Sequence, residues 1–148
     1  MPAVQTAFPL RQDAGLPGGA AMSRYSSDTG VVETAAGIPV GAPVMRGADP
    51  RGIALYAPGG GAFLGISRQN RGGTSDVHPR YKPAGYFTGA SGVFVLAEGN
   101  NAVDAVVRWN TATQRYTSAA ASGTVIECTG WTFDTPTTGG GLAIIKRV

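Results

Sequence analysis

The fold is decided by residues 102–133, AVDAVVRWNTATQRYTSAAASGTVIECTGWTF. Three apolar runs lie in this stretch, at 102–110, 114–120 and 124–133, and short segments rich in Thr, Ala, Ser and Gly separate them. Runs of this length between turn-forming residues are typical of β-strands that pair with their neighbours along the chain. The stretch therefore predicts three consecutive strands.

The first of these runs alternates between two faces. Val103, Ala105, Val107 and Trp109 are two residues apart, so their side chains share one face of an extended strand. That face is expected to be buried, and the other face, with Asp104, Val106 and Arg108, is expected to be exposed.

Similar apolar runs continue in both directions along the chain. The chain has 23 Gly and 10 Pro residues, which interrupt it at intervals of about ten residues and leave no long helical period. The further predicted strands are 43–47, 53–57, 62–68, 85–88, 92–98 and 142–148. Eight or nine short strands predict an all-β protein with a single β-sandwich or barrel.

The N-terminal residues have a different composition. Pro2, Pro9 and Pro17 each lack a backbone donor, so residues 1–42 are expected to form an extended arm and residues 43–148 the β domain. The arm nevertheless carries spaced apolar side chains such as Phe8 and Leu10. These side chains favour a surface to lie on, either the parent domain or a neighbouring protein, but the arm could also fray in solvent, and the sequence leaves these alternatives open.

Charge is scarce and is concentrated in the first half. Charged residues make up 14% of the chain and hydrophobic residues 43%, so much of the surface must be neutral and able to contact other protein closely. A long polar loop is expected over 69–84, and the cationic residues in and beside it face only Asp76. Nucleic-acid domains carry a denser basic patch with interleaved aromatic residues, so protein contacts are favoured over nucleic acid.

No catalytic, metal or cofactor site is evident. His78 is the only histidine and is expected in an exposed loop, without the second His or Cys of a zinc site. Cys128 lies in an apolar run and is expected to be buried. Neither glycine triplet, at 59–61 or 139–141, has the spacing of a nucleotide-binding loop. The sequence predicts a protein that is not an enzyme and needs no cofactor.

Targeting signals are also absent. The first residues lack the basic and apolar regions of a signal peptide, and no run approaches the roughly 20 apolar residues of a membrane span. We expect synthesis in a cytoplasm, with no membrane partner.

Three stretches resemble the structural cement proteins of tailed bacteriophage heads. They are the opening MPAVQTAF with the Pro/Gly-rich arm to Gly19, the GAFLGISR segment at 61–68, and the closing GTVIECTGWTFDTPTTGGGLAIIKRV at 123–148. The resemblance implies a β-sandwich or jelly-roll on the outside of a capsid, and hence location in the virion. It also implies binding to the major capsid protein and self-association across a symmetry axis, with a homodimer favoured over a trimer. The family has no catalytic residues to carry over.

Contacts with the capsid or another copy are expected to involve the arm and the cationic residues around the 69–84 loop. The expected contact residues are Val4, Phe8, Leu10, Arg11, Leu16, Met22, Arg24, Arg68, Arg71, Arg80 and Lys82.

The alternative is a carbohydrate- or receptor-binding β-sandwich module of a virion or secreted protein. Such a module would expose Trp131, Tyr81 or Tyr86 around a polar pocket, whereas a cement protein would bury its aromatic residues in its core or in protein contacts.

Overall fold

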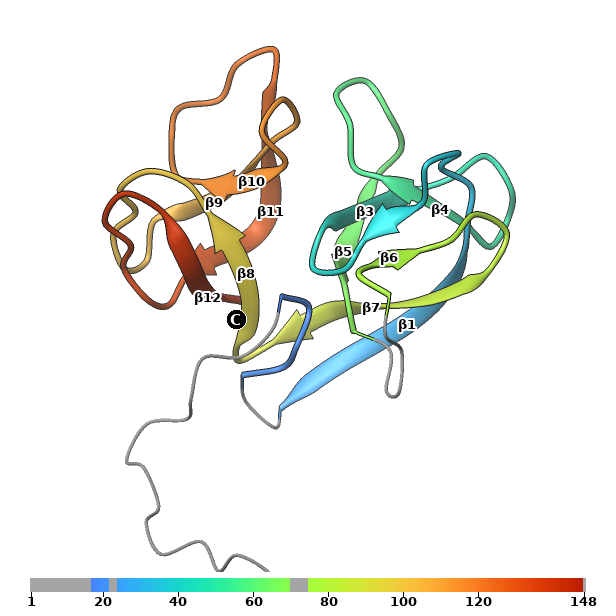
Figure 1. Ribbon diagram of the computed structural model, residues 1–148, viewed down its shortest axis with the longest axis horizontal. Helices are drawn as coiled ribbons and strands as arrows, with labels where there is room; N and C mark the ends of the chain where they lie inside the picture. Colours follow the sequence, from blue (N-terminus) through green and yellow to red (C-terminus); the bar gives the residue numbers. More distant parts are fainter. Residues whose placement is uncertain (1–16, 22–23, 70–74, 148) are drawn as a thin grey trace, which may run out of the picture.

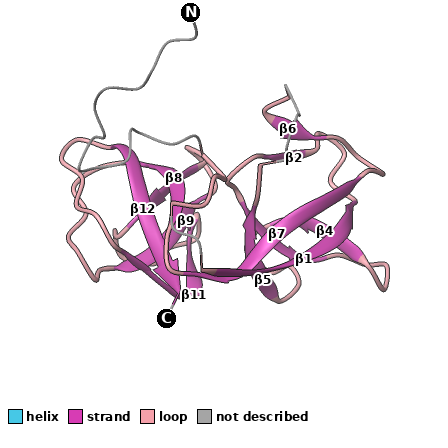
Figure 2. Cartoon of the chain, turned by 90° about the horizontal axis from the view of Figure 1, so that it is seen from below, coloured by secondary structure: helices cyan, strands magenta, loops and turns pink. Residues whose placement is uncertain are grey.

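The computed structural model describes residues 17–21, 24–69 and 75–147. These residues form twelve strands and no helix, and the strands are arranged as two barrels side by side (Figures 1 and 2). The chain completes all five strands of the first barrel, crosses through the short turn between Ala90 and Val93, and then builds the second.

The first barrel has five strands, and β1 closes it by pairing with both β4 and β7. The β1–β4 pair is parallel and the other pairs are antiparallel. In barrel order the strands are β1 (Tyr25–Val32), β4 (Gly52–Leu55), β3 (Pro43–Arg46), β5 (Phe63–Ser67) and β7 (Pro83–Ala90).

The second barrel also has five strands, and a parallel contact between Tyr116 of β10 and Ala97 of β8 closes it. In barrel order the strands are β10 (Arg115–Thr117), β8 (Val93–Ala97), β12 (Gly141–Arg147), β11 (Val125–Phe133) and β9 (Val106–Asn110). A separate two-stranded sheet joins β2 (Ile38–Pro39) to β6 (Val77–His78).

One hydrophobic core runs through both barrels. Buried apolar side chains of the first barrel, among them Val44, Ile66 and Phe87, form a single cluster with Trp131 and Ile145 of the second. Because burial of apolar area is the main favourable term in folding, we expect the shared cluster to couple the two barrels.

Hydrogen bonds also cross from one barrel to the other. The buried Tyr116 hydroxyl donates to the Gly41 carbonyl at 2.6 Å. Arg147 Nη1 donates to the Thr88 carbonyl at 2.8 Å, on the side where β12 approaches β7. These bonds set the orientation of one barrel against the other, since hydrogen bonds are directional.

The segment 17–21 bridges the two barrels. Gly18 donates its backbone N–H to the Phe94 carbonyl at 2.9 Å, and its own carbonyl accepts from Gln69 N at 2.9 Å. Gly18 has a φ of 75°, and a Cβ there would lie 2.6 Å from Val40 Cγ1. Glycine is therefore required at this position, both for its backbone conformation and for the close packing.

The all-β prediction, with a sandwich or barrel, is confirmed. Each of the nine predicted runs overlaps one strand, and the structure adds that ten of the strands close into two five-stranded barrels, where one jelly-roll-like domain was expected. Three strands were not foreseen: β1, β2 and β6.

The segment 1–42, predicted as an arm, contains two of these unforeseen strands. β1 and β2 lie within it, so the first described strand begins at Tyr25, before Pro43, and Ala20 already forms an isolated bridge with Val93. Most of β1 is exposed and polar, which removes the apolar alternation that marks a strand in the sequence. Residues 1–16 lie outside the described residues, and the prediction that they form an arm stays a prediction.

The side chains of residues 102–110 are buried and exposed only partly as predicted. Val107 and Trp109 are buried, but Val103 is 49% exposed. The strand starts at Val106, because Ala105 N bonds back to the Ala102 carbonyl and Asp104 has a φ of 64°. A turn therefore replaces the first part of the predicted strand, and the alternation does not extend through it.

Candidate docking surface

His78 is not the exposed loop residue that the sequence indicated. It lies in β6, is 2% exposed, and its Nε2 is 3.0 Å from the Arg68 carbonyl oxygen. Burial lowers the pKa of the imidazole, so the neutral form is favoured. The sequence could not reveal this burial, because β6 is too short to show a period.

Cys128 is buried, as predicted, at the centre of β11. Burial raises the pKa of its thiol, which keeps the sulfur protonated and unreactive. Among the described residues, no cluster of three or more His, Cys, Asp or Glu could hold a metal ion. In the same residues, no helix could span a membrane.

The aromatic residues are mostly internal. Trp131 is 1% exposed and Tyr86 is 7% exposed, so neither forms the open sugar-binding platform that the alternative reading requires. Tyr81 is 70% exposed. The surface features described next are a cationic hollow, a second cationic group and a groove.

A cationic hollow lies where the start of β1 meets the ends of β7 and β12. It has a volume of about 480 Å³ and is lined by Arg24, Tyr25, Ser26, Gly89, Ala90, Ser91, Lys146 and Arg147. None of these lining residues is acidic. Lys146 is balanced by ion pairs with Asp134 at 3.0 Å and Asp104 at 3.3 Å, so Arg24 and Arg147 give the hollow its net positive charge.

Arg68 lies beside this hollow and shares Tyr25 with it. Its guanidinium carbon is 5.4 Å from the centre of the Tyr25 ring and 5.6 Å from that of Phe87, and Nη1 donates to Ser27 Oγ at 3.0 Å. Cation–π contacts of this kind hold the guanidinium in one orientation while leaving other donors available. We use "cationic strip" for Arg24, Tyr25, Arg68 and Arg147.

A second cationic group lies at the other end of the β1–β7 ladder. Val32 N bonds to the Lys82 carbonyl, and the Arg80 guanidinium carbon is 4.5 Å from the centre of the Tyr81 ring. Tyr81 has a φ of 64°, an uncommon conformation for a bulky residue, and it leaves the ring projecting into solvent.

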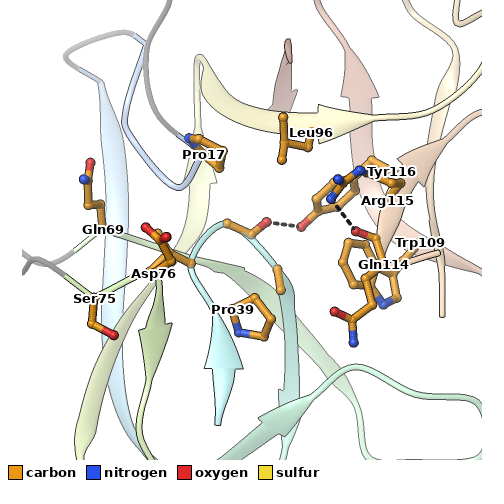
Figure 3. Close-up of a pocket in the computed structure, with 13 residues that line it drawn as sticks. Pro17, Pro39, Gln69, Ser75, Asp76, Leu96, Trp109, Gln114, Arg115 and Tyr116 are labelled. Atoms are coloured by element: carbon orange, nitrogen blue, oxygen red, sulfur yellow. Dashed lines mark hydrogen bonds between the residues drawn. The ribbon is translucent and has the colours of Figure 1, made fainter. Parts of the chain in front are cut away.

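A groove lies between parts of the two barrels (Figure 3). This inter-barrel groove has a volume of about 350 Å³, and Trp109, Tyr116, Leu96 and Pro39 supply apolar parts of its lining. Figure 3 shows Gln69, Ser75 and Asp76 on one side and Gln114 and Arg115 on the other, with Pro17 and Leu96 towards the top of the view.

The structure brings some predicted contact residues together and separates others. Arg24 and Arg68 lie at one end of β1, and Arg80 and Lys82 at the other. The remaining predicted contact residues lie outside the described residues: Val4, Phe8, Leu10, Arg11, Leu16, Met22 and Arg71.

Sequence reasoning did not select Tyr25 and Arg147. Arg147 is more than a hundred residues from Arg24 in the chain, and only the approach of β12 to β7 brings it to the hollow. Tyr25 is a single aromatic residue between an arginine and four small or polar residues, which is a pattern that could have marked a contact site. The sequence analysis placed it in the expected arm instead.

Comparison with known proteins gives a consistent result. The sequence matches a family model described as "Structural cement protein (E217 gp24/Pam3 gp6)" over residues 4–147. Among curated proteins, no sequence matches the chain. A solved structure titled "The capsid of Myoviridae Phage XM1" contains a chain with a TM-score of 0.69 and 13% identity, with 97% of this chain and 96% of that chain covered. At that identity the likeness shows a shared fold.

Proposed function

The chain belongs to the structural cement proteins of phages, and we propose that it binds the outer surface of the major capsid protein lattice and stabilises the head without catalysing a reaction. A structural role in the phage capsid follows from the family. The finer statement, that it acts by binding the lattice from outside, is supported by the shape and charge of its surface.

The observation that carries the proposal is the family match across residues 4–147, nearly the whole chain. Two features of the molecule agree with it. The reactive side chains His78 and Cys128 are buried, and the accessible surface instead offers a cationic strip with an exposed aromatic ring, Tyr25. Arginine and tyrosine are the residue types enriched where protein surfaces bind each other.

The cationic strip is proposed as the main contact with the capsid protein. Arg68 is held by Tyr25 and Ser27, so less side-chain entropy is lost when it binds a partner. An acidic surface of the capsid protein would match this charge, and the other predicted contact residues, Arg80, Lys82 and those of segment 1–24, would extend the interface. We further propose that the protein is made in the host cytoplasm, associates as a homodimer, and binds neither nucleic acid nor membrane.

Many weak contacts are sufficient for such a clamp. Copies fixed in a lattice present their sites at high effective concentration, so modest affinity at each contact adds up to firm attachment. The low overall charge of the chain, 14% charged residues, permits close approach to a neighbouring protein without large desolvation costs.

The test is co-sedimentation with phage shells that lack the protein, using wild type and the variants Arg24→Gln, Arg68→Gln and Arg147→Gln. Each variant lowers the net charge by one, and each is expected to weaken shell binding by roughly threefold to tenfold, as for partly exposed charged contacts. The matched control is Ala121→Glu, which also lowers the net charge by one but lies on the exposed β10–β11 loop.

Saturable binding that is weakened by the three arginine variants and unchanged in the control would support the proposed contact. Equal weakening by all four variants would mean that net charge alone drives binding. If the wild-type protein does not bind shells at all, the cement function proposed here is wrong.

A further inference from the structure

The turn between β3 and β4, residues 47–52, is held in place at one end of the first barrel. The Glu33 carboxylate accepts the backbone N–H groups of Ala48 at 2.7 Å and Asp49 at 2.8 Å. Within the turn, Gly52 donates its N–H to the Asp49 carbonyl at 2.9 Å. Because these bonds fix the turn before a partner arrives, it loses little conformational entropy on binding.

A polar hollow of about 280 Å³ lies beside this turn. Its lining includes Asp28, Arg46 and Tyr86. Each of these residues is an even number of positions from a buried residue of its own strand, so all three side chains face the interior of the barrel near its end. The buried residues are Val32, Val44 and Ala84. The hollow is therefore the mouth of the first barrel, a common place for a binding site.

The donors in this hollow suit a carboxylate. Arg46 and Arg51 both line it, and Arg46 Nη1 donates to the Pro50 carbonyl at 2.8 Å, which orients the guanidinium. Asp28 is the acidic residue of the lining, and its carboxylate accepts the backbone N–H of the next residue at 2.7 Å. Within the described residues every ion pair involves Lys146, so neither arginine is neutralised there. Guanidinium groups that face a hollow in this way bind carboxylates with charge-assisted hydrogen bonds.

A second hollow, of about 350 Å³, shares Pro50 and Arg51 with the first. Its lining also includes Tyr81 and Val31, whose side chain is 40% exposed. Val31 is one position out of step with the buried Val32, so it lies on the outer face of β1. Pro50, Val31 and the Tyr81 ring together provide an apolar surface on which a side chain of a partner can pack.

Tyr81 is held in a conformation that is unfavourable for an aromatic residue. Its φ is 64°, and its N–H donates to the Val32 carbonyl at 2.8 Å, which fixes the backbone. The ring is mostly exposed and carries the Arg80 guanidinium 4.5 Å from its centre, so burial of the ring within the chain does not compensate the strain. Strained residues of this kind are concentrated at binding sites, and tyrosine beside arginine is typical of interface centres.

We use "barrel-end surface" for Val31, Arg46, Arg51 and Tyr81. We propose that this surface is a second docking site for the major capsid protein, which places an acidic side chain in the polar hollow and an adjacent apolar side chain against Tyr81. Charge supports this occupant, because the carboxylates of Glu33 and Asp28 already accept backbone N–H groups whereas the arginines face the hollow.

The inference rests on the proposed function and adds the chemistry of the partner at a surface separate from the cationic strip. Tyr25 of the strip and Val31 of the barrel-end surface lie near opposite ends of β1, which places them about 20 Å apart along an extended strand. The two surfaces therefore contact different places on the lattice, and both contribute to the avidity of one copy.

Zero-length cross-linking to shells tests the position of the carboxylate. A carbodiimide joins a lysine amine to a carboxylate with loss of water and leaves arginine unmodified, so Arg51→Lys keeps the charge and introduces a reactive group. The full-length variant is bound to shells that lack the protein, treated with carbodiimide and analysed by mass spectrometry. We expect an amide between residue 51 and an Asp or Glu of the capsid protein, at several times the yield given by residue 115 in the control Arg115→Lys, which is exposed on the second barrel.

A Tyr81→Asn variant separates binding from folding. Asparagine tolerates a positive φ better than tyrosine does, and the lost ring is mostly exposed, so the midpoint of thermal unfolding should be unchanged or higher. Shell binding should weaken by roughly tenfold, because an aromatic anchor is removed. The control Val103→Asn removes an apolar side chain that is 49% exposed on the second barrel, and it should leave shell binding unchanged.

Several outcomes would overturn the barrel-end surface while leaving the cement function intact. These are shell binding by wild type together with a residue-51 amide no more abundant than the control, an amide only within the same chain, or an amide to a second copy of this chain. Unchanged shell binding by Tyr81→Asn, or a loss of binding that merely follows a loss of stability, would also contradict it. If wild type does not bind shells, the cement function and the barrel-end surface are both wrong.

Discussion

The imidazole of His78 is the one buried histidine side chain, and its protonation is coupled to folding. Ile38 pairs with it across the β2–β6 sheet, and its Nε2 lies 3.0 Å from the Arg68 carbonyl oxygen. Arg68 belongs to the cationic strip, so His78 is placed directly beneath a residue that we propose contacts the capsid. The imidazolium form would still donate from Nε2 to this carbonyl, so protonation is opposed by burial of the charge and not by loss of the hydrogen bond.

Stability is therefore expected to fall in mild acid. Burial holds the folded-state pKa of His78 below its ordinary value of about 6.5, so between these two values the unfolded chain binds more protons than the folded one. The free energy of unfolding should drop as the pH is lowered through this window and then level off below the folded-state pKa. Urea unfolding between about pH 7.5 and pH 5.5 measures this. A His78→Gln variant should lose the dependence, and a flat wild-type curve would refute it.

At the scale of secondary structure elements, the pairing of β5 with β7 depends on a glycine. Ile66 pairs with Phe87 and Ser67 with Tyr86, and Gly65 lies where the two backbones come together. A Cβ built at Gly65 would overlap the Phe87 carbonyl oxygen. The glycine is needed for space, and it allows the first barrel to close over a filled core.

Gly65→Ala should separate these strands. The expected cost is about 3 kcal/mol in the free energy of unfolding, because the rigid backbone of Phe87 cannot move aside. The matched control is Gly123→Ala, where nothing lies within 4 Å, and its effect should stay within about 0.5 kcal/mol. Chemical denaturation of the two variants beside wild type gives the comparison. If Gly65→Ala and Gly123→Ala had similar free energies of unfolding, β5 and β7 would be able to move apart at little energetic cost.

At the scale of the whole molecule, the two barrels are joined through a shared core and a few hydrogen bonds. The bond from Tyr116 to Gly41 is fully buried, whereas the bond from Tyr56 to the Glu127 carbonyl, 3.0 Å, is accessible to solvent. Tyr116 also forms part of the inter-barrel groove. The same side chain therefore bonds one barrel to the other and lines the groove between them.

Tyr116→Phe should destabilise the protein more than Tyr56→Phe. Removing the Tyr116 hydroxyl leaves the buried Gly41 carbonyl without this donor, at an expected cost of about 2 kcal/mol. Water can replace the Tyr56 hydroxyl at Glu127, so about 0.5 kcal/mol is expected there. Thermal and urea unfolding of both variants measure the difference. A larger loss from Tyr56→Phe would mean that the solvent-accessible contact is the one that holds the barrels.

For the candidate surface, the distribution of charge along the sequence predicted some of the cationic residues but not all of them. The excess of arginine and lysine in the first half led to Arg24, Arg68, Arg80 and Lys82, and all four carry positive charge near the β1–β7 ladder. Arg147 was not selected, because its place beside Arg24 depends on a strand more than a hundred residues away. Local sequence carries no information about such distant neighbours.

The sequence by itself determined that the protein is built of β-strands and where nine of them lie, because an apolar run between turn residues folds locally as a strand. It did not determine β1, whose side chains are mostly polar and exposed. Only the tertiary structure decided that the strands close into two barrels, that His78 is buried and that a groove lies between the barrels. Those features depend on the register and closure of strands far apart in the chain, and side-chain alternation specifies the face of a strand but not its partner.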